Sequence, residues 1–472
     1  MVAAAPVLAP CRLKGVASEA VCGVIKRPLD PARPDGPQID LHYAVVPALA
    51  RNKRADPVFF LAGGPGQSAI EVAGAMSQRL ARFSNRRDLV FVDQRGTGRS
   101  APLKCPHDDP RLIIQPLAEA VDPAVMVGRM AACRAALEQL PHGDLRMYTT
   151  TIAMADLDAV RATLGAERIN LIGASYGTRA ALEYMRRFPQ RLRRVVIDGV
   201  APPDMVLPRS FSADTQAAFD ALLGWCEADA RCHQQHPALR ADWQALLKRL
   251  PVTTEATHPV TGQVERVTLG ADLITGMVRS PLYAPALAAG LPAAISAAAQ
   301  GRFGPLMGLS LALTAAGDGI ASGMHFSVLC AEDAPRMAAS TEALGHDFGD
   351  SFTRQYVSVC QHWPRGAVPA DFYTIAAAPV ATLVLSGGLD PATPPRHGVR
   401  VTQALGAKAR HVLVAHAGHG TLGSPCMRDQ VFRFIDAASD DEALKPALDC
   451  TDGVPRPPLF VPVAQRASGA TR

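Results

Sequence analysis

The chain has 472 residues, of which 48% are hydrophobic and 19% charged, a composition typical of a soluble globular protein. Its net charge of +5 is spread along the sequence in short clusters, which favours a solvated surface and excludes a nucleic-acid-binding function. No run of eighteen apolar residues predicts a membrane span. The length predicts either one large domain with an insertion or two domains.

Seven apolar runs predict strands. The first, at residues 38–49, alternates in polarity and is typical of an antiparallel strand at the start of a sheet. The others are almost continuously apolar, as in a parallel sheet that is buried on both faces. They occupy residues 56–66, 87–98, 169–177, 193–200, 380–390 and 409–420. Helical patterns at 151–168 and 178–189 separate some of them, and this alternation indicates βαβ units.

The strand pattern disappears between residues 201 and 375, where the sequence is rich in Ala, Leu and Gln and mostly helical. We therefore expect an α/β core formed by residues 1–200 and 376–472, interrupted by a helical cap at 201–375. The Pro-rich end of the chain, from residue 454, predicts an extended tail.

The ten cysteines include no C-x-x-C pair, which argues against a thioredoxin-like or zinc-ribbon site. Their even number and their Pro-rich surroundings favour disulfides and a periplasmic or secreted protein, with ten buried thiols in a cytosolic enzyme as the alternative. The N-terminus does not resemble an intact signal peptide, so we expect a leader to have been removed. The simplest pairing, among others that the sequence leaves open, joins Cys11–Cys22, Cys105–Cys133, Cys226–Cys232, Cys330–Cys360 and Cys426–Cys450.

Ser175 lies between Gly173 and Gly177, where a predicted strand meets a predicted helix. An N-capping serine in a glycine-rich turn is one explanation. The other is a nucleophile elbow, G-x-S-x-G, in which a strained turn exposes the serine hydroxyl. The glycines would be needed because a Cβ at either place would clash with the neighbouring elements.

Two further strand ends carry the partners that a serine nucleophile needs. Asp390 follows the strand at 380–390 and His419 follows the strand at 409–420, which is the order Ser, Asp, His of α/β-hydrolases. The imidazole would take the serine proton, and the carboxylate would orient the imidazole. Asp198 is the rival acid and His416 the rival base. Each residue could instead have a structural role, but the three together favour a triad.

The turn "LAGGPGQS" predicts the oxyanion donors. Its backbone N–H groups, with that of Tyr176, would face the reacting carbonyl. Because G-x-G-x-x-G and G-K-[ST] are absent, the turn is not a phosphate site, and we expect neither a metal nor a cofactor. In the next turn, "DQRGTGRS", we expect Asp93 and Arg95 to pair beneath the site as a scaffold.

Together, "AGGPG", "VDQRGTGRS", "GASYG", "LSGGLDPATPP" and "AGHG" resemble the prolyl- and tripeptidyl-aminopeptidase group of α/β-hydrolases. The resemblance covers both ends of the core and continues through "AFDALLGWCEADARC", "CAEDAP" and "CQHWP". It implies a mostly parallel sheet under a helical cap, disulfides in secreted members, a triad of Ser175, Asp390 and His419, and oxyanion donors at Gly64 and Tyr176. Ala62 departs from the short prolyl aminopeptidases, which carry His there, and this weakens the substrate assignment.

An aminopeptidase must bind a free α-ammonium, and in this family the acids come from the cap. Glu332, with Asp333 beside it, is our expected partner, although a surface role is as plausible. The expected substrate is therefore a peptide or a small acyl compound with a free amine. The alternatives are an esterase or amidase acting on a non-peptide acyl substrate, and a catalytically silent binding protein.

Overall fold

The computed structural model describes residues 8–108, 116–120, 122–258, 260–312 and 319–460. Its centre is a nine-stranded sheet with the order β1-β2-β3-β5-β4-β6-β7-β10-β11. In this spatial order, the neighbouring strands β5, β4, β6, β7, β10 and β11 are all parallel to one another, and β3 pairs with β5 in the antiparallel direction. The strands are β1 Ala9–Cys11, β2 Ala20–Pro28, β3 Gln38–Val46, β4 Val58–Leu61, β5 Leu89–Val92, β6 Ile169–Ala174, β7 Leu192–Asp198, β10 Thr382–Gly387 and β11 Ala409–Val414.

Helices cover both faces of this sheet, which explains why the central parallel strands β4 and β5 are apolar and buried throughout. Successive residues of one strand enter different cores, with Phe60 on one face and Phe59 on the other. One face packs on α1 Ala73–Arg79, α17 Pro425–Asp436 and α18 Asp440–Ala443, and the other packs on α4 Thr150–Thr163, α5 Tyr176–Arg187 and α16 Pro395–Leu405. The fold is the α/β-hydrolase arrangement that the sequence predicts.

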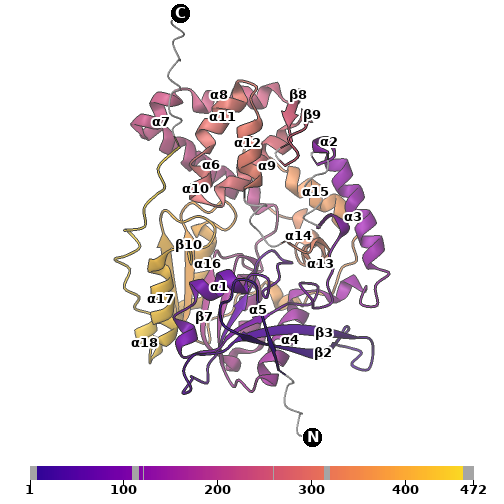
Figure 1. Ribbon diagram of the computed structural model, residues 1–472, viewed down its shortest axis with the longest axis vertical. Coiled ribbons are helices and arrows are strands. Elements are labelled where there is room, and N and C mark those ends of the chain that lie inside the picture. Colours follow the sequence, from indigo (N-terminus) through magenta and orange to yellow (C-terminus); the bar gives the residue numbers. More distant parts are fainter. Residues whose placement is uncertain (1–7, 109–115, 121, 259, 313–318, 461–472) are drawn as a thin grey trace, which may run out of the picture.

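A helical insertion lies over one end of the sheet (Figure 1). Its centre is a separate apolar core around Phe219, Trp243 and Ile274. Its elements are α6 Ser210–Ala228, α7 Ala230–Gln235, α8 Leu239–Arg249, β8 Val252–Thr257, β9 Val264–Leu269, α9 Ala271–Leu282, α10 Pro285–Ala288, α11 Leu291–Ala299, α12 Gly304–Leu311, α13 Ser322–Glu332, α14 Ala334–Met337 and α15 Ser351–Cys360. The sequence analysis predicts this region as mostly helical and did not predict the antiparallel strand pair β8–β9.

Two segments from outside residues 201–375 also pack on the insertion. The first contains α2 Leu117–Ala120 and α3 Pro123–Leu137; the Leu117 N–H donates to Glu265 on β9 at 2.7 Å. The second is the C-terminal segment, which runs back from α18 to the cap (Figure 1). There Leu459 enters the cap core, and the Phe460 N–H donates to the Ala289 carbonyl at 2.9 Å.

All ten cysteines form disulfides in the pairing of sequence neighbours, and this prediction is confirmed. Two of these bonds lie in the second half of the chain. Cys330–Cys360 joins α13 to α15 within the cap, and Cys426–Cys450 ties α17 to the C-terminal segment. Within the residues that the structure describes, no helix is both long and apolar enough to span a membrane.

Candidate active site

Ser175 occupies a strained turn between β6 and α5. Its backbone has φ 56° and ψ −124°, a conformation that costs a non-glycine residue energy and often marks a functional turn. A Cβ on Gly173 would lie 2.3 Å from the Gly177 carbonyl oxygen, and a Cβ on Gly177 would lie 2.2 Å from that of Leu61. Both glycines are therefore required by the close passage of helix and strand, as the nucleophile-elbow interpretation expects.

Asp390 and His419 meet beside this turn. His419 Nδ1 lies 2.8 Å from Asp390 Oδ2, which leaves Nε2 available to another group. Asp390 also accepts the Ala392 and Thr393 N–H groups, each at 2.8 Å, and the Thr393 hydroxyl at 2.7 Å. The carboxylate is 1% exposed, so the protein holds it in one orientation toward the imidazole.

Residues 198 and 199 bring the serine and the histidine together. The Ser175 N–H donates to the Asp198 carbonyl at 2.9 Å. A Cβ on Gly199 would lie 3.5 Å from His419 Cε1. In the described part of the chain, Ser175 Oγ forms no hydrogen bond to His419, a contact that often tightens only when substrate binds.

The rival residues have other partners. The Asp198 carboxylate accepts the Thr421 N–H at 2.8 Å and the Leu422 N–H at 3.1 Å, so it holds the turn that carries the histidine. His416 Nδ1 lies 2.9 Å from the Val454 carbonyl. Geometry therefore favours Asp390 and His419 over both rivals.

The electrostatics of the pair suit a general base. Burial disfavours the imidazolium, but the charge of Asp390 and its hydrogen bond outweigh burial and raise the pKa of His419 above its usual value. Burial would raise the pKa of Asp390, but His419 and the N–H donors of its turn lower it below the usual value. Asp390 is thus ionised at neutral pH and stabilises a protonated His419.

The predicted oxyanion donors lie on either side of Ser175. Tyr176 begins α5, so its N–H has no partner within the helix. Gly64 has φ 107°, which glycine adopts without strain. Among the described residues, neither N–H donates to a protein acceptor. A Cβ on the adjacent Gly63 would lie 3.1 Å from Ser175 Cβ, so the loop closely approaches the nucleophile.

The cap contacts the histidine directly. The Tyr283 ring lies edge-on to the His419 ring with centroids 5.0 Å apart, and the His419 N–H donates to the Tyr283 carbonyl at 2.9 Å. Arg279, one turn earlier on α9, donates to the Tyr283 hydroxyl at 2.5 Å. On the other side, His325 of α13 contacts the Pro65 carbonyl at 3.1 Å, so the cap also holds the oxyanion loop.

Glu332 and Asp333 are fully buried beside α5. Asp333 accepts both terminal nitrogens of Arg179, at 2.7 and 3.1 Å. Glu332 accepts the Thr150 N–H at 2.7 Å and lies 3.4 Å from Arg179 Nη1. Burial, opposed by Arg179, raises the pKa of Glu332 to about 7. Both acids thus have protein partners and no exposed surface, so amine binding by them stays a prediction that this geometry does not favour.

The predicted pairing of Asp93 with Arg95 is wrong. Arg95 donates to both oxygens of Asp156 on α4, at 2.6 and 3.0 Å. Asp93 accepts the Ser68 hydroxyl at 2.6 Å and the Ile70 N–H at 3.1 Å. The two side chains leave the turn in different directions, and each supports a different neighbouring segment.

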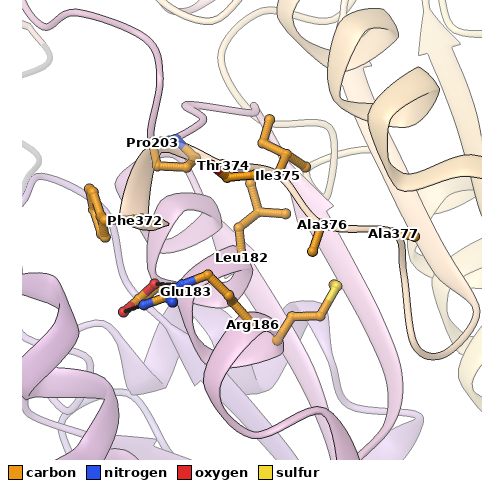
Figure 2. A pocket seen from close by; sticks show the side chains of 10 residues that line it. Leu182, Glu183, Arg186, Pro203, Phe372, Thr374, Ile375, Ala376 and Ala377 are labelled. Carbon is orange, nitrogen blue, oxygen red and sulfur yellow. Dashed lines mark hydrogen bonds and ion pairs between the residues drawn. The ribbon is translucent and has the colours of Figure 1, made fainter. Parts of the chain in front are cut away.

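Two pockets of the described residues lie away from the triad. Figure 2 shows a hollow where Leu182, Glu183 and Arg186 of α5 face the segment 372–377. Its volume of about 20 Å³ holds about one water molecule, and Glu183 and Arg186 already pair at 2.8 Å. A larger pocket of about 430 Å³ lies between α3, α9, α12 and α15.

One group of side chains has a metal-like arrangement within the described residues: Cys105, His107 and Asp108. Cys105 forms a disulfide with Cys133, and Asp108 accepts the N–H and hydroxyl of Ser322. With its sulfur already bonded, Cys105 offers no thiolate ligand.

Thr393, Tyr283 and Arg279 contact the site or its histidine and were not identified from the sequence. Thr393 had a usable signal, because a threonine three residues after an aspartate often bonds back to it in a turn. Tyr283 and Arg279 lie on a cap helix whose sequence has no motif. Only the packing of the cap on the core places them beside His419.

Comparison with known proteins identifies the family of the chain. Residues 56–423 match the family described as alpha/beta hydrolase fold. The serine protease Hip1 of Mycobacterium tuberculosis is 27% identical over 434 residues, which cover 84% of this chain and 82% of that protein. The tripeptidyl aminopeptidase of Streptomyces lividans is 32% identical over 197 residues, covering 39% and 35%. Carboxylesterase B of M. tuberculosis is 28% identical over 421 residues, covering 82% and 78%. The family match spans well over half of the sequence, so the chain belongs to the α/β-hydrolase family.

Proposed function

We propose that this protein is a serine hydrolase that removes N-terminal residues or short peptides through an acyl-enzyme. The observation that carries this proposal is the contact of His419 with Asp390 beside a strained, glycine-flanked Ser175. The sequence similarity to a serine protease and to a tripeptidyl aminopeptidase supports a peptide substrate.

In this mechanism Ser175 Oγ attacks the scissile carbonyl carbon while His419 Nε2 takes the hydroxyl proton. The Gly64 and Tyr176 N–H groups donate to the oxyanion of the tetrahedral intermediate. His419 then gives the proton to the leaving amine, and the acyl-enzyme forms. Water, deprotonated by His419, releases the acyl group and restores the serine. Asp390 stays ionised throughout and stabilises the imidazolium.

Amine recognition needs a carboxylate that can reach the substrate. Glu332 would have to leave the Thr150 N–H and become exposed before it could bind an ammonium. We therefore assign Glu332 and Asp333 a structural role, in which they hold Arg179 and the start of α4.

An esterase or amidase is the second candidate. Its support is the similarity to carboxylesterase B, which extends over most of both chains. The same triad serves both reactions, because ester and amide cleavage pass through the same acyl-enzyme.

We also propose that the protein acts outside the reducing cytoplasm, in the periplasm or as a secreted enzyme. The support is that every cysteine is paired in the structure. Disulfides persist in oxidising compartments and are rare in the cytosol.

The test is a set of p-nitroanilides of amino acids and tripeptides, each with a free and an acetylated amine, together with simple p-nitrophenyl esters. Selective turnover of the free-amine compounds supports the aminopeptidase. Equal turnover of both forms, or turnover of esters alone, would support the second candidate instead.

Ser175→Ala is the control for this experiment. It should fold and lose at least about a thousandfold in kcat, because the triad acts as a unit. A fluorophosphonate should label the wild type at Ser175 and leave the variant unlabelled. Activity that survives in the variant would contradict the assignment of the nucleophile.

A further inference from the structure

Arg279 lies on α9, on the side of the cap that contacts the histidine turn. Its guanidinium carbon lies 4.3 Å from the centroid of Phe211, 5.1 Å from that of Tyr283 and 5.2 Å from that of Phe352. Aromatic faces attract a cation, so these three rings hold the charge in place. Phe211 lies on α6, Tyr283 directly follows α9 and Phe352 lies on α15, so the position of the charge depends on the assembled cap.

The Arg279 guanidinium has no carboxylate partner among the described residues. Across the described segments, no Asp or Glu forms an ion pair with Arg279, and its single hydrogen bond goes to the Tyr283 hydroxyl. Its Nε is buried without an acceptor. Buried polar groups normally have partners, and arginine is the side chain that binds carboxylates most specifically.

The position of the charge connects it to catalysis. Arg279 donates its hydrogen bond to the Tyr283 hydroxyl, and the Tyr283 ring lies 5.0 Å from the His419 ring. The positive charge also opposes protonation of His419, although Asp390 has the larger effect and the pKa of His419 stays above its usual value. Without a counter-ion, Arg279 therefore disfavours the imidazolium that must form during the reaction.

We infer that Arg279 is a specificity residue that binds a carboxylate of the substrate next to the scissile bond. This inference rests on the proposed serine-hydrolase function and names its substrate class: a short acyl or peptidyl compound with an anionic group. A bound carboxylate would satisfy the fork of Arg279 and neutralise the charge that opposes His419. Anionic substrates would thus bind more tightly, and they would also favour the transfer of the Ser175 proton to His419.

The carboxylate could come from two parts of a peptide, which the experiment separates. One is an acidic side chain close to the scissile bond, and the other is the free C-terminus of a short leaving peptide. A space for the neighbouring part of the substrate lies close by, because Phe352 also lines the 430 Å³ pocket between α3, α9, α12 and α15.

The experiment measures kcat and KM for matched substrate pairs. One pair has Glu or Gln in the residues before the scissile bond of a free-amine p-nitroanilide. A second pair is a short peptide with a C-terminal carboxylate or carboxamide. A third pair is p-nitrophenyl hemisuccinate and its methyl ester. The anionic member of at least one pair should have a kcat/KM at least about tenfold higher in the wild type.

Arg279→Gln should abolish the difference in kcat/KM between the two members, chiefly by slowing the anionic one, whereas Arg279→Lys should keep part of the difference. Arg279→Gln should also move the acidic limb of the kcat/KM profile to higher pH, because the remaining groups that face His419 are Asp390, Asp198 and the Tyr283 ring. Arg456→Gln is the matched control. Arg456 also lies over an aromatic ring, Trp225 at 3.6 Å, with an unpaired buried Nε, and its loss should leave the preference unchanged.

The outcomes are distinct. A wild type without preference in any pair, or a preference that survives Arg279→Gln, would overturn the inference. Equal loss on both members of every pair would assign Arg279 to cap packing alone. If no compound is hydrolysed and Ser175 is not labelled by fluorophosphonate, the proposed function itself fails. If only the ester pair is hydrolysed, the peptidase proposal fails and the hemisuccinate pair still tests Arg279.

Discussion

Asp390 at the end of β10 and Glu332 at the end of α13 are both almost completely buried, at 1% and 0% exposure. Their pKa values nevertheless shift in opposite directions. That of Asp390 is lowered, and that of Glu332 is raised to about 7. Burial alone raises the pKa of any carboxyl group, so the difference must come from what surrounds each one.

Asp390 accepts three hydrogen bonds from residues 392 and 393 and faces His419. Glu332 has one close N–H donor, and its arginine lies farther away and is shared with Asp333. A like charge beside it raises its pKa further. The comparison teaches that a buried acid is kept ionised by the charge and the donors that face it. His419 and the catalytic turn supply both to Asp390, whereas in the cluster around Arg179 most of the donors go to Asp333 rather than to Glu332.

Replacing Asp390 by Asn tests this difference between the two acids with the largest expected effect on activity. The amide keeps the shape but removes the charge that holds the His419 tautomer and stabilises the imidazolium. We expect kcat to fall by about 10⁴-fold, measured on the best free-amine substrate. Asp198→Asn is the matched control, since its carboxylate accepts backbone N–H groups of the histidine turn and does not contact the His419 ring, although its charge acts on His419 from a distance. An equal loss in both variants would mean that the two acids share the role.

The pH dependence of kcat/KM tests the same electrostatics on a smaller scale. Only neutral His419 can take the serine proton, and its pKa is raised. Activity should therefore rise with pH through an apparent pKa above the usual 6.5 of histidine and fall about tenfold per pH unit below it. A midpoint at or below 6.5 would contradict the predicted influence of Asp390.

Glu332→Gln should have the smallest effect on activity and a measurable effect on stability. The folded protein binds a proton at Glu332 that the unfolded chain releases between pH 4.5 and about 7. Its contribution to stability is thus present below 4.5 and lost as the pH rises through 7. The free energy of unfolding of the wild type should fall relative to the variant by about 3 kcal/mol across this range, as urea titrations would show.

Asp333→Asn is the control for that experiment. It breaks the two-point contact with Arg179 and should destabilise the protein by about 3–5 kcal/mol whether the solution is acidic or neutral. Activity decides the role of Glu332. A Glu332→Gln variant that loses turnover of free-amine substrates but not of simple esters would restore its predicted role as the ammonium partner.

The sheet core could be predicted because the sequence signal for each strand and each catalytic residue lies within a few neighbouring residues. Each apolar run ends in a turn whose residues carry the chemistry, so Ser175, Asp390 and His419 follow from strand ends and their order. The predicted pairing of Asp93 with Arg95 was wrong because it used only local information. Two residues that are close in sequence need not contact each other, since a long side chain can reach a partner from a distant segment. Arg95 extends to Asp156, which is 61 residues away.

The cap could be predicted only as a helical region. Its amphipathic patterns identify helices but not which faces meet, so the three rings around Arg279 could not be derived from the sequence. The pair β8–β9 did have a signal, since residues 252–257 and 264–269 are rich in Val and Thr, which favour strands, and the turn between them contains Gly262. The burial of Glu332 was hidden because its partner Arg179 lies 153 residues earlier.

The C-terminal segment has a mechanical consequence. The chain leaves the core after α18, is fastened by Cys426–Cys450, and attaches again to the cap at Leu459 and Phe460. Together with the links near residues 200 and 375 and with the segment that carries α2 and α3, this gives the cap four connections to the core. A cap with two adjacent connections can rotate about them as one rigid body, but several separated connections leave no common hinge axis. Motion of the cap over Ser175 is therefore expected to be local, and trimming the chain before residue 456 should remove one of these connections and loosen the cap.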